Sequence, residues 1–269
     1  SLMAEGVHSV SDCTNQGLLL WGQRAAKKPP SHSHPLGYGR EAFFWSFIVA
    51  IMLFSGGGLY SIYEGWHKFH AGGELTSPYI GIGILLFAMC LEGFAFSACL
   101  KEVRATSPHR NLWEWIKHTT KADLLVIFLE DFAALLGLTI ALTALLLSWI
   151  TGNALFDAIG SLAIGTLLIA TAAILAIEVK SLLIGERASK DYRSEVERIV
   201  HNVIPGAQLK DFITLQQGIN NIMATYKVAL PDGQIRSSKA AAYIHQIESK
   251  VVEKYPEVKW QFVELDAAA

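Results

Sequence analysis

The sequence predicts an all-α membrane domain of five spanning helices, followed by a small α+β domain with the element order αββαβ. Hydrophobic residues make up 52% of the 269 residues and charged residues only 17%, whereas soluble globular domains carry about a quarter of charged residues. The shortage of charge is confined to the first two thirds of the chain, and the last third has the composition of a soluble domain. We therefore expect a transmembrane domain over residues 1–185 and a polar domain over residues 186–269.

Five segments are long enough to cross a bilayer, which takes about 20 mostly apolar residues. They cover residues 1–23, 41–67, 78–100, 122–150 and 155–180. The first segment is the most polar of the five. It is either a helix that lines a polar pathway through the membrane or an amphipathic helix on the membrane surface.

Loop charges predict the orientation of these segments. Basic residues gather in the loops 24–40 and 101–121, whereas the other two loops carry only Lys68. By the positive-inside rule, the two basic loops and the C-terminal domain face the cytoplasm. Five spans then leave the first residue on the far side or inside the membrane, so we expect that one upstream span is missing from this chain. The protein is predicted to be an integral multi-pass membrane protein.

The C-terminal domain shows alternating helix and strand patterns. Helices are predicted at residues 188–203 and 236–254, and strands at 208–216, 220–229 and 257–265. A Pro-Asp-Gly turn at 231–233 separates the second strand from the second helix. The order αββαβ predicts a three-stranded sheet covered by two helices.

Several classes of function are excluded by composition and motifs. A net charge of −2 gives no basic surface for nucleic acid. The sequence has no phosphate-binding GxxxxGK[ST] loop and no visible nucleophile–base set, so we expect neither an enzyme nor a bound cofactor. The three cysteines form no CxxC motif and read as ordinary unpaired thiols in or beside apolar segments.

Two pairs of polar residues stand out in the predicted membrane helices. His8 and Asp12 are four residues apart in the first segment, so a helix would direct both side chains the same way from consecutive turns. Glu130 and Asp131 interrupt the apolar run 124–147. Ionisable groups at membrane depth are costly and usually face a partner or a watery pathway. The two pairs therefore predict a divalent cation held between two helices.

The ligand set combines one imidazole with two or three carboxylate oxygens. Adjacent helical residues diverge by about 100°, so one of the two acidic residues is expected to face His8. Asp131 is the preferred ligand and Glu130 the reserve. Such a set suits Zn²⁺ and also tolerates Mn²⁺, Fe²⁺ or Co²⁺. The alternative is that these polar side chains pair with each other and only hold the helices together.

Three other polar residues are weaker candidates for a functional role. His32 and His34 in the first basic loop are either a weak metal site or solvated loop histidines. Glu92 lies inside the apolar segment 78–100, where it is either a proton carrier or an interhelical hydrogen-bonding group.

Four short segments together resemble a known family. They are Gly-Val-His-Ser-Val-Ser-Asp at 6–12, His-Pro-Leu-Gly-Tyr-Gly-Arg at 34–40, Leu-Glu-Asp-Phe-Ala-Ala-Leu-Leu-Gly at 129–137 and Ile-Thr-Gly-Asn-Ala-Leu-Phe-Asp-Ala-Ile-Gly-Ser-Leu at 150–162. The chain is similar over essentially its whole length to the cation diffusion facilitators, in the branch that contains zinc transporter nine. The resemblance implies a dimeric, proton-coupled exporter of Zn²⁺ and related metals. It also implies six spans and a metallochaperone-like αββαβ module, which agrees with the order derived above.

The resemblance also assigns roles to individual residues. It implies that His8 and Asp12 form one half of the transport site and that Asp131 belongs to the other half. The family's second histidine falls on Ile127, which leaves a fourth ligand to be supplied by Glu130, water or Cys13. A metal site in the first loop is implied to be degraded, because its positions read Ser31, His34 and Tyr38 unless His32 compensates. A charge lock is implied between Arg40 and Glu186.

Taken together, the sequence predicts a homodimeric antiporter in the lipid bilayer that exports a divalent metal, with Zn²⁺ as the first candidate, in exchange for protons. The alternative is a non-transporting membrane scaffold or regulator that acts through its C-terminal domain.

Overall fold

The computed structural model describes residues 2–71, 78–106, 111–188, 191–231 and 237–267. The side chains of residues 2–13, 71, 78, 106, 237, 238 and 267 lie outside this description. The chain forms two compact units: residues 1–24 with 42–180, and residues 25–41 with 181–269. The loop 25–41 is part of the second unit.

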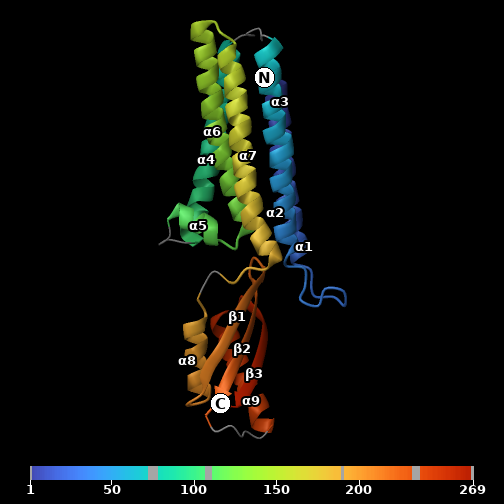
Figure 1. Cartoon of the computed structure of the whole chain (residues 1–269), viewed down its shortest axis with the longest axis vertical. Helices are drawn as coiled ribbons and strands as arrows, with labels where there is room; N and C mark the ends of the chain where they lie inside the picture. The colour runs from blue at the N-terminus through green and yellow to red at the C-terminus, as the bar shows by residue number, and fades with distance from the viewer. Residues whose placement is uncertain (1, 72–77, 107–110, 189–190, 232–236, 268–269) are drawn as a thin grey trace. The chain divides into compact units, whose positions relative to one another are not determined.

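The first unit is built from long helices (Figure 1). Its elements are α1 (Leu2–Ala26), α2 (Glu41–Met52), the π-helical segment η1 (Leu53–Leu59), α3 (Tyr60–Ala71), α4 (Pro78–Thr106), the short α5 (Leu112–His118), α6 (Ala122–Thr151) and α7 (Leu155–Ile184). Within the described residues, four helical segments are long and apolar enough to cross a membrane: Glu41–His70, Tyr79–Ala105, Ala122–Thr151 and Leu155–Ile184. Four of the five predicted spans are therefore confirmed as candidates. The first predicted span is a 25-residue helix, and its passage through the membrane remains a prediction.

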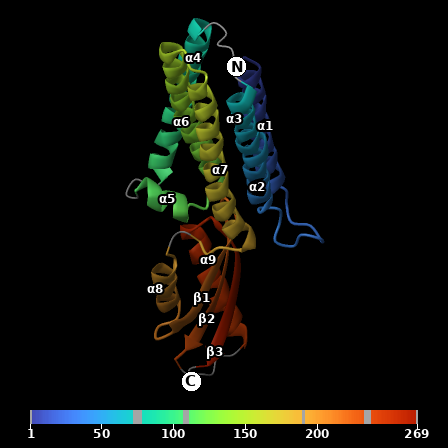
Figure 2. The same ribbon diagram turned by 45° about the horizontal axis from the view of Figure 1, so that its top comes forward.

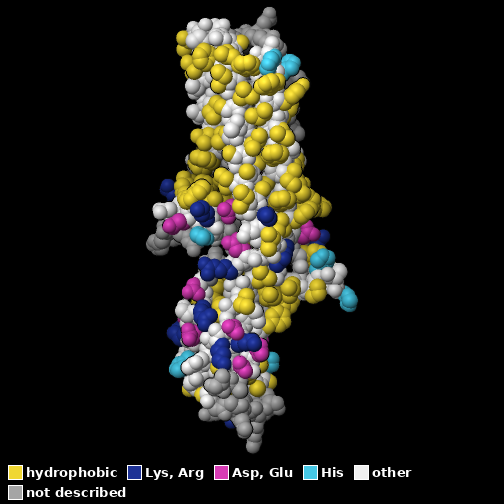
Figure 3. Space-filling model, in the orientation of Figure 1, with side chains coloured by type: hydrophobic (Ala, Val, Ile, Leu, Met, Phe, Trp, Pro, Cys, Tyr) yellow, Lys and Arg dark blue, Asp and Glu magenta, His cyan; other side chains and the backbone are white. Residues whose placement is uncertain are grey.

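Exposed side chains on these helices are strongly apolar. Figure 3 shows hydrophobic side chains over the visible face of the helical unit. Large aromatic and aliphatic groups are mostly exposed, among them Phe94 on α4, Ile150 on α6 and Ile177 on α7. In water such a surface would be unfavourable, whereas lipid tails are as apolar as these side chains. The surface therefore fits a bilayer.

Small residues set the spacing between the α2–η1–α3 helix and α7. A Cβ placed on Gly165 of α7 would lie 2.8 Å from the backbone nitrogen of Ile62 and 2.9 Å from the carbonyl oxygen of Gly58. A Cβ on Gly65 would lie 2.9 Å from the backbone nitrogen of Leu162. The two helix backbones approach so closely that only glycine fits at these points. Gly65 and Gly165 thus serve packing.

Aromatic side chains join α4, α5 and α6. The ring of Phe96 on α4 lies 5.5 Å from that of Phe128 and 6.1 Å from that of Phe132, both on α6. The buried ring of Trp115 on α5 meets Phe128 edge-on at 5.5 Å. These contacts show that the face of α6 with Phe128 and Phe132 packs against α4 and α5.

The second unit contains α8 (Arg193–Val203), β1 (Gln208–Gly218), β2 (Asn221–Leu230), α9 (Ser237–Lys254) and β3 (Val258–Ala267). The predicted order αββαβ is confirmed. Figure 2 shows the strands side by side in the order β1-β2-β3. β1 pairs with β2 antiparallel, and β2 pairs with β3 in parallel. The parallel pair requires a crossover connection, which α9 provides.

One face of the sheet and the two helices share a hydrophobic core. It includes Val196 and Val200 of α8, Tyr226 and Val228 of β2, and Ile247 of α9, all essentially without exposure. This unit has a core of its own, as expected for a domain with a soluble composition.

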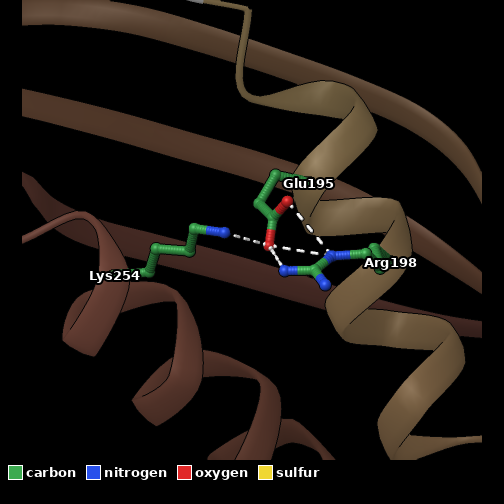
Figure 4. Close-up of polar contacts among 3 residues, drawn as sticks. All are labelled: Glu195, Arg198 and Lys254. Atoms are coloured by element: carbon green, nitrogen blue, oxygen red, sulfur yellow. Dashed lines mark hydrogen bonds and ion pairs between the residues drawn. The ribbon is translucent and has the colours of Figure 1, made fainter.

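An ion-pair cluster ties the ends of α8 and α9 together (Figure 4). The Nε of Arg198 donates to both carboxylate oxygens of Glu195, at 3.1 Å and 3.2 Å, and the Lys254 ammonium pairs with the same carboxylate. These hydrogen bonds, first from Arg198 and then from Lys254, lower the pKa of Glu195 to about 2. Because this pKa is depressed, the cluster stabilises the fold above the ordinary carboxyl pKa and loses that effect as the pH falls toward 2.

Candidate metal centre

Two side-chain hydrogen bonds connect α1 to α6. The amide nitrogen of Asn15 donates to Oε1 of Glu130 at 2.9 Å. Nearer the C-terminal end of α1, the amide nitrogen of Gln23 donates to Oδ2 of Asp123 at 2.7 Å. Both bonds join α1, which carries His8 and Asp12, to α6, which carries Glu130 and Asp131. The structure therefore brings together the two helices that the sequence singled out.

The two bonds also fix the register of this helix pair. Asn15 and Gln23 are eight residues apart, whereas Glu130 and Asp123 are seven residues apart in the opposite direction. At a rise of about 1.5 Å per residue, these intervals correspond to roughly 12 Å and 10 Å, so the helices run antiparallel at matching levels. Asp131 lies next to Glu130 and is therefore at the level of Asn15.

The buried side of α1 follows a helical spacing. Asn15, Leu19 and Gly22 are buried, at intervals of four and three residues. The same spacing continued toward the N-terminus reaches positions 12 and 8. His8 and Asp12 lie within α1, and their side chains are outside the described residues.

The two acidic residues on α6, Glu130 and Asp131, have different surroundings. Asp131 is buried, with 9% of its surface exposed. Glu130 is partly buried and holds the Asn15 amide. Ile127, one turn before Asp131, offers an aliphatic side chain and no ligand atom. Asp131 thus has the burial expected of a ligand within a helix bundle, and Glu130 has a partner of its own on α1.

Within the described side chains, no group of three or more His, Cys, Asp and Glu residues is close enough to hold a metal ion. His8 and Asp12, the other predicted ligands, lie in the N-terminal half of α1, and their side chains are outside the described residues. The metal site predicted from the sequence remains a proposal.

The loop histidines contact other groups. The ring of His34 stacks on Tyr38 with centroids 4.3 Å apart, and its Nδ1 lies 3.2 Å from the hydroxyl of Ser33. The Tyr38 hydroxyl is hydrogen-bonded to Ser31 at 3.0 Å. His32 is exposed. The weak metal site predicted at His32 and His34 remains a proposal.

Arg40 is held by other groups than Glu186. Its Nε donates to Oε1 of Gln217 at 3.1 Å, and its Nη1 donates to the carbonyl oxygen of Leu183 at 3.3 Å. Glu186 takes part through its backbone carbonyl, which accepts a hydrogen bond from the Gln216 amide at 2.8 Å. Among the described side chains, no ion pair links Arg40 to Glu186. The arginine therefore joins the loop 25–41 to the end of α7 and to β1 through neutral acceptors.

The same loop touches the β1–β2 turn through glycine. A Cβ on Gly39 would lie 2.5 Å from the carbonyl oxygen of Gln217, and one on Gly218 would lie 2.8 Å from the Cα of Gly39. Backbone meets backbone at this point, so neither position has room for a side chain.

Glu92 lies on α4, one turn before Phe96, and is partly buried. Phe96 packs on Phe128 and Phe132 of α6, so Glu92 belongs to the part of α4 that lies beside α6. Its predicted role as a proton carrier remains a proposal.

The sequence did not predict that Asn15 is the α1 residue that bonds Glu130. The signal was available: Asn15 follows His8 and Asp12 by seven and three residues, which is the spacing of one helical face.

Comparison with known proteins places the chain among cation efflux proteins. The family model described as the cation efflux transmembrane domain matches residues 1–184. The chain is 32% identical over 211 residues to the human proton-coupled zinc antiporter SLC30A9, mitochondrial, which covers 75% of this chain and 36% of that protein. It is 30% identical over 203 residues to metal tolerance protein C4 of Arabidopsis thaliana, covering 75% of this chain and 44% of that protein. It is also 28% identical over 244 residues to the Xenopus laevis antiporter of the same name as the human protein, covering 87% and 42%. The chain thus spans less than half the length of these relatives.

Proposed function

Because the chain belongs to the cation efflux family, which consists of transporters and not enzymes, we propose that it exports a divalent metal cation across its membrane in exchange for protons. Zn²⁺ is the first candidate substrate, since the human and frog relatives carry the name of a proton-coupled zinc antiporter. The observation that carries the proposal is the pairing of α1 with α6, which puts Asp131 and the His8–Asp12 helix side by side. Alternating exposure of this site to the two sides of the membrane moves the metal.

The proposed ligands have distinct roles. Asp12 and Asp131 supply negative charge, and His8 supplies a nitrogen donor. The set suits Zn²⁺ and accepts Mn²⁺, Fe²⁺ or Co²⁺ as well. Imidazole changes its charge between about pH 5 and pH 8, so His8 is also the group that exchanges metal for a proton.

Flux measurements on His8→Ala test the transport mechanism. Proteoliposomes that contain the wild-type protein are expected to take up Zn²⁺ faster than protein-free liposomes, and the rate is expected to respond to an imposed pH gradient. His8→Ala is expected to slow uptake by at least about 10-fold and to flatten the dependence on pH, because the variant lacks a ligand and an exchangeable proton. The readout is a fluorescent zinc indicator inside the vesicles, with the pH varied on each side.

His67→Ala is a suitable control, because His67 is an exposed histidine on α3. Its flux and pH dependence are expected to match the wild type. If the wild-type protein transports no divalent metal under any gradient and binds none in solution, the scaffold alternative is preferred. If His8→Ala transports like the wild type, His8 is not part of the pathway.

We further propose that two copies associate through the open face of the C-terminal sheet. On this face Ile213 is 62% exposed and Phe262 is 53% exposed, and both pair with Thr225 of the central strand. Leu215, Met223 and Trp260 form the next row across the sheet. An apolar sheet face of this kind is typical of a protein interface.

The charges beside this apolar area favour a second copy as the partner. Lys227 pairs with Glu264 at 3.3 Å, and Lys210 pairs with Asp266 at 3.7 Å. Each pair is neutral as a whole, so two identical faces can meet about a two-fold axis without a surplus of like charge.

Ile213→Asp combined with Phe262→Asp tests this interface. The double variant is expected to shift the protein from dimer to monomer, because association would bury two charges. Light scattering coupled to size-exclusion chromatography in detergent gives the mass. Val252→Asp on α9 is the control, since Val252 is exposed outside the sheet and is expected to leave the dimer intact. A double variant with the wild-type dimeric mass would rule out this face.

A further inference from the structure

Asn15 is almost fully buried, with 2% of its surface exposed, on the side of α1 that lies against α6. Its amide nitrogen donates to the Glu130 carboxylate. A carboxylate only accepts hydrogen bonds, so the nitrogen of the amide must face Glu130. The amide oxygen therefore faces away from that carboxylate.

This oxygen has an unusual position. Among the residues that the structure describes, Oδ1 of Asn15 is buried and has no hydrogen-bond partner. Leaving a buried acceptor unpaired costs free energy, and native proteins rarely do so without a reason. An amide oxygen that is held in place by its own nitrogen and kept from other partners is prepared to receive a donor or a cation.

The surroundings favour a cation. Asp131 is buried at the same level of the helix pair as Asn15, and Glu130 is bound to the amide nitrogen. Two carboxylates close together repel anions and attract positive charge. On α1, the spacing of the buried side leads from Asn15 back to positions 12 and 8.

We propose that the side-chain oxygen of Asn15 is a direct ligand of the transported cation. It completes a set to which His8, Asp12 and Asp131 contribute, while Glu130 orients the amide and is not itself a ligand. This inference rests on the proposed transport function and deepens it by naming the fourth ligand.

The chemistry of this ligand bears on the choice of substrate. An amide oxygen is a harder donor than an imidazole nitrogen, and Mn²⁺ favours oxygen ligands more than Zn²⁺ does. A site with one nitrogen and three oxygens therefore accepts Mn²⁺ together with Zn²⁺. Removal of the amide oxygen is expected to weaken the binding of Mn²⁺ more than that of Zn²⁺.

Two substitutions separate the oxygen from the nitrogen of the amide. Asn15→Ala removes both atoms, whereas Asn15→Asp has nearly the same shape, keeps an oxygen and loses the N–H donor to Glu130. If the oxygen is a ligand, Asn15→Ala weakens Mn²⁺ binding by at least about 10-fold and Zn²⁺ binding by a smaller factor, and Asn15→Asp keeps or raises both affinities. If Asn15 only holds Glu130, Asn15→Asp is as defective as Asn15→Ala.

Gln23→Ala is the matched control. It removes the other amide that joins α1 to α6, at the Asp123 end of the same helix pair, and it leaves the proposed site untouched. We expect its affinities for Zn²⁺ and Mn²⁺ to equal those of the wild type.

The measurement is titration of the full-length protein in detergent with Zn²⁺ alone and with Mn²⁺ alone, by calorimetry. A spectroscopic measurement on the wild type adds a readout that does not depend on the alanine variant folding. In the infrared difference between metal-bound and metal-free protein, a side-chain amide carbonyl band moves to lower frequency, and this band is missing in Asn15→Asp.

The outcomes distinguish the inference from the function on which it rests. If the wild type and Gln23→Ala bind neither metal, the proposed transport function fails and this inference fails with it. If both bind metal and Asn15→Ala binds equally well, or if the infrared band stays unshifted, transport stands and Asn15 is not a ligand. Equal losses in Asn15→Ala and Gln23→Ala would show that both amides act only in helix pairing.

Discussion

Asp131→Asn is expected to bind Zn²⁺ at least about 100-fold more weakly than the wild type and to lose transport, while the protein keeps its fold. The replacement has nearly the same shape as aspartate, so the packing around this buried position is retained. It removes one of the two negative charges of the proposed site, and loss of a ligand costs at least as much as loss of its outer partners, which is roughly 10- to 100-fold. Calorimetric titration and vesicle flux measure the two effects.

Asp157→Asn is the matched control for this change. Asp157 lies on α7, where it pairs with Lys68 of α3 at 3.1 Å, and 40% of its side chain is exposed. Binding of Zn²⁺ to this variant is expected to equal that of the wild type. Undiminished binding in Asp131→Asn would remove Asp131 from the site and would leave Glu130 as the candidate on α6.

Gly165→Ala is expected to destabilise the protein by about 1–3 kcal/mol or more, although the change adds a single methyl group. The new Cβ would lie 2.8 Å from the backbone nitrogen of Ile62 and 2.9 Å from the carbonyl oxygen of Gly58. Backbone atoms of a helix cannot move aside singly, so α7 and the α2–η1–α3 helix would have to separate. Thermal unfolding of the purified protein, monitored by size-exclusion chromatography of heated samples, gives the loss of stability.

Gly137→Ala applies the same chemical change to another buried glycine within a helix. Its Cβ would meet nothing nearer than the Cγ2 of Ile164 at 3.8 Å, which is an ordinary contact. Because alanine favours helix over glycine by about 1 kcal/mol, this variant is expected to be as stable as the wild type or more stable. If the two variants melt alike, close approach at Gly165 does not limit the packing.

Much of the fold was predictable because it depends on local composition. An apolar run the length of α6 or α7 has few alternatives to a spanning helix. The αββαβ order of the second unit followed from hydrophobic period and from one strong turn at 231–233. The π-helical segment η1 was not predicted, since its three consecutive glycines carry no side-chain pattern. Its geometry goes together with the close contact between Gly58 and α7.

The candidate site was only partly predictable. The cost of ionisable groups in an apolar segment marked Asp131 and Glu130, and helical spacing marked His8 and Asp12. The hydrogen bond between Glu130 and Asn15 could not be predicted, because it depends on how α6 is rotated against α1. The structure shows Glu130 bound to Asn15 and Asp131 buried beside it.

The anchor at Arg40 illustrates the same limit. The family resemblance implied Glu186 as the partner of Arg40, and the guanidinium group donates to Gln217 and to the carbonyl of Leu183. These acceptors lie 177 and 143 residues from Arg40 in the chain. Sequence patterns report charge and period but contain no information on which distant acceptor a side chain reaches.

The sequence by itself determined that this chain has spanning helices, that a separate αββαβ unit follows them, and which ionisable residues enter the apolar segments. Burial of apolar side chains enforces these features, and burial depends on composition and spacing. Only the tertiary structure decided that Asn15 pairs with Glu130, that glycine contacts set the distance between α7 and the α2–η1–α3 helix, and that the first loop joins the second unit. Each of these depends on the relative rotation and distance of elements far apart in the chain, which packing settles to within a fraction of an ångström.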